Sequence, residues 1–270
     1  MPAYYGDDDA RYLQHTAELM HQLKQRSYEL MHIQPGGKVL DVGCGPGIDT
    51  VALAHLVGPT GQVVGIDFNP TFVAQGDDRA VQAGVKPWVT HQQAEATALP
   101  FESHRFDACR SERLLQHVHN SEQVVAEMVR ITRPGGWIVI ADADWGTLSI
   151  DTAEVDLERR LVRCEADAHH NGYAGRQLYR LLRRQQLTDI LIELVPLYFT
   201  DYRLAEQVIG PAALAQEALR RGVITTEEAH RWTTSLAQAD AEGVFFASMH
   251  GVLIAGCKPE HRAPVAIRET

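Results

Sequence analysis

The stretch that decides the fold of this 270-residue chain is KVLDVGCGPG, residues 38–47. Its apolar first half predicts a short buried strand, and the following sequence, IDTVALAHLV, predicts a helix. Gly43, Gly45 and Gly47 fall where the strand turns into the helix. Because glycine has no Cβ, these positions permit positive φ and let a ligand approach the backbone closely. Such a turn also presents free backbone N–H groups, which predicts a ligand site at the carboxyl end of the strand.

The rest of the first half repeats this alternation of strands and helices. We predict further strands at residues 62–67, 88–91, 106–111 and 137–143, helices at residues 10–32, 70–83 and 121–132, and turns at residues 35–37, 58–61 and 133–136. Because the predicted strands are largely apolar on both faces, helices should cover both sides of the sheet. The pattern therefore predicts an α/β fold with a doubly wound, mostly parallel sheet.

The pattern changes after residue 150. Helices are predicted at residues 152–169 and 175–186, and strands at residues 190–199 and 244–257. Between these strands, residues 203–241 should be helical, with breaks near Gly210 and Gly222. We expect seven strands in all, an antiparallel last strand and a helical cap. The expected divisions are an N-terminal helix or lid (1–34), a ligand-binding core (35–150), the cap elements with the last strands (151–258) and a tail (259–270).

Composition excludes several classes of protein. The 25 Lys and Arg against 35 Asp and Glu leave a net charge of −10, which disfavours broad binding to nucleic acid. No apolar run approaches the roughly 20 residues of a membrane helix. The acidic, polar N-terminus is unlike a secretory signal, so we predict a cytoplasmic location. Cys44, Cys109, Cys164 and Cys257 lack the spacing of a metal or redox motif, so we expect reduced thiols and no metal.

The glycine spacing narrows the class of ligand that the turn can bind. A dinucleotide fingerprint is GxGxxG, but its third glycine would fall at Ile48, so the motif here is GxGxG. Asp41, two residues before Gly43, suits a cationic or amine-bearing ligand better than a pyrophosphate. The next strand ends in Asp67, which is placed to accept hydrogen bonds from ribose hydroxyls. Phe68 beside it offers a flat apolar face for a purine.

Several motifs, taken in order, carry a resemblance to a known family. They are VLDVGCGPG at 39–47, GID at 65–67, AE at 94–95 with LPF at 99–101, FD at 106–107 and RPGG at 133–136. Together they resemble the class I S-adenosylmethionine-dependent methyltransferases. The closer likeness is to the subgroup of ubiquinone/menaquinone C-methyltransferases and many small-molecule methyltransferases, over about residues 35–142. The resemblance implies a Rossmann-like fold and S-adenosylmethionine as cofactor.

The resemblance also implies roles for single residues at the methionine half of the cofactor. The residues concerned are Asp41, Gly43, Cys44, Gly45, Gly47, Ser111 and, on the first helix, Arg26. Asp41 would face the amino group, and Arg26 would contact the carboxylate. The backbone at 43–45 would line the ligand, and Ser111 would lie near the sulfonium. A solvated helix face is the alternative for Arg26.

At the adenosine half, the resemblance implies that Asp67 holds the ribose hydroxyls and that Phe68 flanks the adenine. Ala94 and Glu95 would lie at the adenine edge. One position departs from the family, because Gln93 stands where an Asp is common. An amide can still hydrogen-bond adenine, so we expect Gln93 to remain part of the site.

Candidates for the substrate side follow the fourth and fifth strands. His117 is the candidate general base, with a loop histidine bonded to backbone as the alternative. Arg113 would recognise a substrate anion, or else form a surface ion pair. Asp144 would bind a substrate amine or make loop hydrogen bonds, and Trp145 would wall the pocket or pack in the core. His169 and His170 are interpreted as a helix end.

The sequence therefore predicts an enzyme that methylates an N, O or C atom of a small molecule, enclosed by an apolar cap. A quinone-type C-methyltransferase and a non-catalytic cofactor-binding or regulatory protein are the alternatives on the same fold. A nicotinamide-dependent oxidoreductase is a further alternative that the glycine spacing disfavours. We expect no nucleic-acid partner and no membrane span, and a homodimer stays open.

Overall fold

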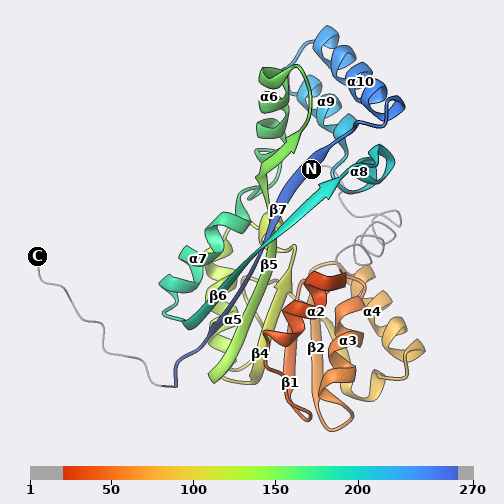
Figure 1. Cartoon of the computed structure of the whole chain (residues 1–270). Helices are drawn as coiled ribbons and strands as arrows, with labels where there is room; N and C mark the ends of the chain where they lie inside the picture. The colour runs from red at the N-terminus through yellow and green to blue at the C-terminus, as the bar shows by residue number, and fades with distance from the viewer. Residues whose placement is uncertain (1–20, 261–270) are drawn as a thin grey trace, which may run out of the picture.

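The computed structural model describes residues 21–260, in which one seven-stranded sheet runs the length of the molecule (Figure 1). The strands are β1 Lys38–Val42, β2 Gln62–Asp67, β3 Val89–Gln93, β4 Phe106–Glu112, β5 Thr132–Ile150, β6 Thr188–Phe199 and β7 Ala247–Cys257. Their spatial order is β3-β2-β1-β4-β5-β7-β6. The first five strands pair in parallel, whereas β7 runs antiparallel to both β5 and β6. The predicted fold class is confirmed.

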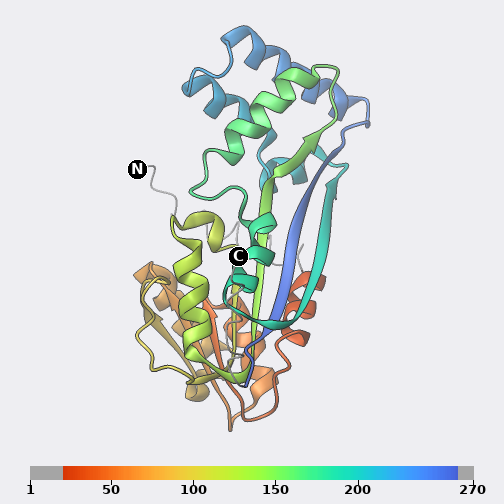
Figure 2. The same ribbon diagram turned by 90° about the vertical axis from the view of Figure 1, so that its left-hand side faces the viewer.

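Helices cover both faces of the lower part of the sheet (Figures 1 and 2). The α-helices are α2 His21–Glu29, α3 Ile48–Val57, α4 Pro70–Gln82, α5 Ser121–Ile131, α6 Val155–Ala166, α7 Ala174–Arg184, α8 Tyr202–Val208, α9 Pro211–Arg220 and α10 Thr226–Ala241. Two short 3-10 helices are η1 Lys86–Trp88 and η2 Leu115–His117. The chain runs from β1 outward through β2 to β3 and then returns to the other side of β1 as β4. Ligands bind at such a switch point in open α/β sheets.

The fifth strand differs from its prediction at both ends. Residues 133–136 were expected to form a turn before the strand, but they are an irregular segment inside it. The pairing with β4 shifts there, from Thr132 opposite Phe106 to Trp137 opposite Ala108. The strand then continues to Ile150, instead of ending at 143. Its last residues, Ser149 and Ile150, pair with β7, which lies about a hundred residues later in the chain. A strand end set by so distant a partner is not visible in local sequence.

Four helices, α6, α8, α9 and α10, form a cap above the carboxyl ends of the first strands (Figures 1 and 2). Strands β5, β6 and β7 extend into this cap and share a hydrophobic core with it. Trp232 of α10 is 1% exposed at the centre of that core. The helical region breaks as predicted, at Gly210 with φ of 57° and before the capping box of Thr225 and Glu228. The cap therefore has a core distinct from those on the two faces of the sheet.

The helix predicted at residues 10–32 is described only from residue 21. Its visible part, α2, packs Leu23 and Tyr28 against the first strands. The remainder of the proposed N-terminal lid, and all but two residues of the proposed tail, lie outside the described residues. The four cysteines are unpaired, as expected. Within residues 21–260, no helix combines the length and apolar character needed to cross a membrane.

Candidate active site

The glycine turn after β1 is held open by bonds to the next strand. Both Gly43 N and Cys44 N donate to the carbonyl of Ile66 at 2.8 Å. Gly43, Gly45 and Gly47 have φ of 74°, 52° and 76°, a region that side chains rarely adopt. A Cβ on Gly47 would also lie 2.7 Å from the Cα of Gly76 on α4. Glycine is therefore required at these positions by the positive φ and, at Gly47, by close packing. Gly43 and Gly45 also line a cavity.

Asp67, at the end of β2, is fixed by the backbone of two loops. Its Oδ2 accepts from Gly45 N at 3.0 Å and its Oδ1 accepts from Asn69 N at 2.9 Å. Burial raises the pKa of Asp67, and the backbone donors partly oppose that rise. Phe68 beside it is 51% exposed, with its carbonyl bonded by Gln93 Nε2 at 3.0 Å. Gln93 therefore supports the loop that presents Phe68.

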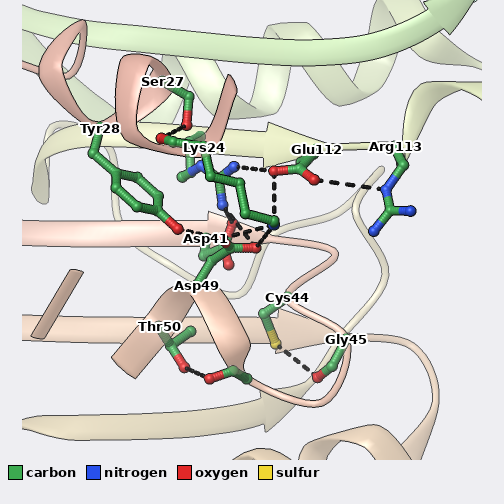
Figure 3. A network of polar contacts seen from close by, with 12 residues as sticks. Lys24, Ser27, Tyr28, Asp41, Cys44, Gly45, Asp49, Thr50, Glu112 and Arg113 are labelled. Carbon is green, nitrogen blue, oxygen red and sulfur yellow. Dashed lines mark hydrogen bonds and ion pairs between the residues drawn. The ribbon is translucent and has the colours of Figure 1, made fainter. Parts of the chain in front are cut away.

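A buried network of charges lies beneath the glycine turn (Figure 3). Lys24 Nζ of α2 lies 2.6 Å from Asp49 and 2.9 Å from Glu112. Arg110 of β4, 1% exposed, lies 2.7 Å from Glu112, 3.2 Å from Asp49 and 3.4 Å from Asp41. The Tyr28 hydroxyl also donates to Asp49. Arg113 adds a third cation, 3.6 Å from Glu112, so three cations and three carboxylates meet in a place largely shielded from water.

The charges in this network move the pKa values of its carboxyls in opposite directions. Burial alone would raise the pKa of Asp49, but Arg110 and Lys24 hold it well below its usual range. Asp41 has the weaker partner, so burial raises its pKa to about 7. Its Oδ2 has no hydrogen-bond partner among the described residues. Asp41 is thus the carboxyl whose charge is least compensated by the network, and it lines the cavity above.

A cavity of about 440 Å³ extends from the glycine turn to the cap. The predicted site residues that line it are Asp41, Gly43, Cys44, Gly45, Asp67, Phe68, Ala94, Glu95, Arg113, His117 and Trp145. They come from the ends of β1, β2, β3 and β4, from the loops that follow these strands, and from β5. The far wall of the cavity belongs to the cap, through Glu165 at the end of α6, His169 in the loop that follows, and residues 206–210 at the end of α8 and just after it. The fold therefore brings most of the predicted residues around one space.

Five predicted residues do not line this cavity. Gly47 packs under the turn, and Gln93 bonds the Phe68 carbonyl. Ser111 is buried within β4, with its Oγ lacking a partner among the described residues. Asp144 lies in β5 and accepts from Arg176 Nε of α7 at 2.6 Å, an ion pair that neither alternative predicted. The fifth is Arg26, discussed next.

Arg26 lies on the outer face of α2, where it pairs with Glu193 at 2.7 Å and with Glu29 at 2.8 Å. The structure does not bring it to the cavity. Lys24, two residues earlier, points inward instead and lines the cavity beside Asp49. The physical reason is helical phase, because residues two apart face roughly opposite sides of a helix. The sequence signal for Lys24 was its position directly after Leu23, which lies on the apolar face of the helix.

The cap side of the cavity carries aromatic and histidine side chains. The Trp145 indole stacks on the His169 ring at 4.7 Å, and its Nε1 donates to Gln116 Oε1 at 2.6 Å. His169 Nε2 lies 3.2 Å from Glu165 Oε1. The ring of His117 is 6.2 Å from that of His169. Sequence reasoning missed Glu165 and His169 because they come near β4 and β5 only through the tertiary fold.

Burial lowers the pKa of His117 to about 4, with further lowering from the positive charges of His169, Arg113 and His170 nearby. His117 is therefore neutral at physiological pH.

In residues 21–260, no group of three or more His, Cys, Asp or Glu side chains is arranged to hold a metal ion.

A second, smaller cavity of about 60 Å³ adjoins the first. Glu112, Arg113, Gln116 and Trp145 line both cavities, and apolar side chains from α2 and the last two strands close the smaller one. Arg113, at the wall between the two, has φ of 51°. A non-glycine residue held at positive φ is strained, and such strain gathers at functional sites.

Comparisons with known proteins agree with this geometry. A family model described as "Methyltransferase domain" matches residues 40–140. An uncharacterized 37.1 kDa protein of transposon TN4556 from Streptomyces fradiae is 33% identical over 245 residues, which are 90% of this chain and 69% of that protein. A ubiquinone/menaquinone biosynthesis C-methyltransferase of Pseudomonas fluorescens is 38% identical over 124 residues. That match covers 46% of this chain and 48% of the relative, so it spans about half the length of each.

Solved structures share the fold at low sequence identity. The YcgJ protein of Bacillus subtilis superposes with a TM-score of 0.63 at 19% identity, over 89% of this chain and all of the other. A geranyl diphosphate methyltransferase in complex with GPP and sinefungin gives a TM-score of 0.56 at 18% identity, over 96% of this chain and 84% of the other.

The glycine turn, the acidic ends of β1 and β2, the sheet order and the family match all point the same way. The chain belongs to the class I S-adenosylmethionine-dependent methyltransferases and is related to the ubiquinone/menaquinone C-methyltransferases.

Proposed function

We propose that this protein transfers the methyl group of S-adenosylmethionine to an N, O or C atom of a small molecule. The observation that carries the proposal is the single cavity of about 440 Å³ that joins the cofactor motif to the cap. That volume lies in the usual range of small-molecule sites, on the order of 300–1,000 Å³. One end offers the groups expected for a nucleoside and an amino acid, and the other offers a separate, partly aromatic wall.

The residues at the lower end fit the cofactor. Asp67 keeps acceptor capacity for ribose hydroxyls, because a carboxylate has about four lone-pair sites and the backbone donors of Gly45, Phe68 and Asn69 use three of them. Phe68 exposes a ring face for adenine. Asp41, with an unbonded Oδ2 and only one cation at 3.4 Å, suits the amino group of the methionine part. We assign to Lys24, rather than Arg26, the position beside the methionine end.

The bound cofactor supplies a methyl group already activated by its sulfonium, so the work left to the protein is positioning and exclusion of water. The loop after β4 holds its place through Asp142, whose Oδ2 accepts from Leu115 N at 2.6 Å. This bond holds η2, and with it Gln116 and His117, over the strand ends. The acceptor then lies between this loop and the cap.

The smaller cavity favours an acceptor with an apolar part. Its walls include Leu23, Leu197, Met249 and Val252, and it opens beside Arg113 and Trp145. This favours quinone-type C-methylation as a second candidate, since the matched relatives include ubiquinone/menaquinone C-methyltransferases. A non-catalytic cofactor-binding protein remains the alternative of a different class. For partners, the charge of −10 supports an acceptor other than nucleic acid.

Calorimetric titration with S-adenosylmethionine and S-adenosylhomocysteine tests the proposal. Wild type should bind both ligands. Asp67→Asn should weaken binding by roughly 10- to 100-fold, the size of a lost hydrogen bond to a charged group. The matched control is Asp78→Asn, an exposed position on α4, which should bind like wild type. Absence of binding by wild type would rule out the proposal.

Turnover separates the enzyme from the non-catalytic alternative. S-adenosylhomocysteine should form when the protein is given S-adenosylmethionine and a panel of phenols, hydroquinones and amines. Cofactor binding without product from any acceptor in the panel would favour the non-catalytic alternative. Methylation of a hydroquinone at carbon would favour the quinone-type candidate.

A further inference from the structure

A histidine and a glutamate of the cap line the cavity that holds the cofactor motif, although neither belongs to that motif. Glu165 lies in the last turn of α6, and His169 follows in the loop between α6 and α7. Both line the cavity that contains the glycine turn and Asp67. Their side chains are mostly buried, 18% exposed for Glu165 and 11% for His169. An exposed helix-end pair would not be enclosed in this way.

The loop that carries His169 is tied to the substrate side by its backbone. Asn171 N donates to the carbonyl of Gln116 at 3.0 Å, and Trp145 N donates to the carbonyl of Gly172 at 2.9 Å. A Cβ on Gly172 would lie 2.0 Å from the carbonyl oxygen of Ala166, so the chain reverses through a point that admits only glycine. The position of His169 is therefore set by η2 and β5 as well as by its own helix.

Two contacts orient the imidazole itself. Its ring stacks on the Trp145 indole with an interplanar angle of 19°, and its Nε2 is 3.2 Å from Glu165 Oε1. A carboxylate accepts but does not donate, so the bond places the proton of a neutral ring on Nε2. The lone pair is then left on Nδ1. A base oriented by a third group is the arrangement that general-base catalysis requires.

We infer that His169, oriented by Glu165, is the general base for an acceptor whose reacting O or N atom carries a proton. This inference rests on the proposed function. In the step, His169 Nδ1 takes the proton that the acceptor atom loses as that atom bonds to the methyl carbon. The S–CH₃ bond breaks with its electron pair remaining on sulfur, which removes the sulfonium charge. Glu165 stabilises the imidazolium that results.

The charges around His169 favour it over His117, the candidate from sequence. His117 is buried beside Arg113, and its pKa of about 4 makes it a weak base near neutral pH. His169 pairs with Glu165, its ring lies 6.2 Å from that of His117, and His170 is next in the chain. Arg113 lines the same cavity. Among the described residues, Glu165 is the carboxylate that pairs with the His169 imidazole.

Nitrogen-15 NMR of histidine-labelled protein tests the inference without a known acceptor. The His169 signals are assigned by their loss in His169→Gln. At neutral pH we expect a neutral ring with hydrogen on Nε2 and none on Nδ1, and Glu165→Gln should mix the two tautomers. A doubly protonated ring, or hydrogen on Nδ1, would overturn the inference, because neither form can accept a proton at Nδ1.

Kinetics with an acceptor from the phenol and amine panel gives the second test. His169→Gln should lower kcat by roughly 10²- to 10⁴-fold, the usual contribution of a general base, with little change in the KM for S-adenosylmethionine. Glu165→Gln should lower kcat less and move the acid limb of the pH profile to lower pH, since the imidazolium loses its carboxylate. His170→Gln is the control, because His170 is exposed and stacks on His119, away from the cavity.

The two proposals fail in different ways. If wild type does not bind S-adenosylmethionine, the proposed function fails. If wild type binds the cofactor and methylates an O–H or N–H acceptor while His169→Gln keeps full activity, only the role of His169 fails.

Discussion

Arg110 and Lys24 lie among Asp41, Asp49 and Glu112 in a part of the molecule shielded from water. Removing charges from water is costly unless each finds a partner; Asp49 has two cationic partners, and Glu112 has three. Asp41 has only a distant one, 3.4 Å from Arg110, so burial favours its protonated form. A cationic ligand above the turn would supply the missing partner. At the residue scale, the site is therefore prepared for a positive charge.

The first prediction concerns the pH dependence of cofactor binding. The pKa of Asp41 in the free protein is raised to about 7, and a cation binds better to its ionised form. Affinity for S-adenosylmethionine should therefore rise with pH, by roughly eightfold between pH 6 and 7.5 if only the ionised form binds. Titration calorimetry at several pH values measures the effect.

Asp41→Asn serves as the control for this dependence. The amide cannot ionise, so the variant should bind more weakly at pH 7.5 and show a much flatter pH dependence. A wild-type affinity that is constant or falls over this range would contradict the assigned role of Asp41.

At the scale of elements, helices α3 and α4 approach each other through glycines. Gly47, at the start of α3, faces Gly76 inside α4, and the His91 ring of β3 fills the space beside them. That ring is held by Thr50 Oγ1 at 2.8 Å and by Asp77 Oδ1 at 2.9 Å. Its side chain is fully buried, so it has no room to move. The close approach keeps the glycine turn seated on the sheet.

The second prediction follows from this packing. Gly76→Ala should improve helix propensity by about 1 kcal/mol. A Cβ at this position, however, would lie 2.7 Å, 2.9 Å and 3.0 Å from three atoms of the His91 ring. Overpacking of this kind usually costs about 1–3 kcal/mol, so the free energy of unfolding should fall. Urea denaturation followed by circular dichroism measures it.

The control on the same helix is Ala74→Gly, an exposed position where only propensity should act. It should lose about 1 kcal/mol of stability. If Gly76→Ala is as stable as wild type or more stable, the packing argument is wrong.

At the scale of the whole molecule, the chain divides its hydrophobic residues between the sheet and the cap. The cap core gathers Trp232, Leu236 and Leu214 with the far ends of β5, β6 and β7. The residues proposed to bind the cofactor lie at the strand ends, outside the cap core. The strands are continuous between the two regions (Figure 1). Damage to the cap should therefore affect the acceptor side more than the cofactor side.

The third prediction tests this division. Trp232 is 1% exposed, and its Nε1 donates to the carbonyl of Pro211 at 2.8 Å. Trp232→Ala should destabilise the cap by about 3–5 kcal/mol. Hydrogen exchange should then accelerate in residues 202–241 and stay slow in residues 38–67. Cofactor affinity should change little, whereas methyl transfer should fall.

The matched control replaces a tryptophan of the sheet. Trp88 packs against the core formed by α3, β1 and β2, and its Nε1 donates to the carbonyl of Ala54 at 3.0 Å. Trp88→Ala should accelerate exchange near α3 and leave the cap protected. Equal acceleration in both regions for either variant would show that the two regions unfold as one.

The sequence alone determined the order of strands and helices, the glycine turn and the carboxylates Asp41 and Asp67. These depend on local spacing, because hydrophobic periodicity and glycine positions act over a few residues. The placement of Asp67 followed from topology, since the carboxyl ends of parallel strands meet at one edge of the sheet. The cap was also predictable, as a helical stretch too long for a turn.

Only the tertiary structure decided which charged residues turn inward. Lys24 and Arg26 lie two positions apart on one helix, and their choice of cavity or surface depends on what packs against each face. The extension of β5 depends on pairing with β7, and the meeting of His169 with Trp145 depends on a loop from the cap. These contacts join residues far apart in the chain. Their energies come from burial and pairing that exist only once the whole sheet has formed. Local sequence offers a hint for Lys24 alone, through helical phase, and none for the end of β5 or the position of His169.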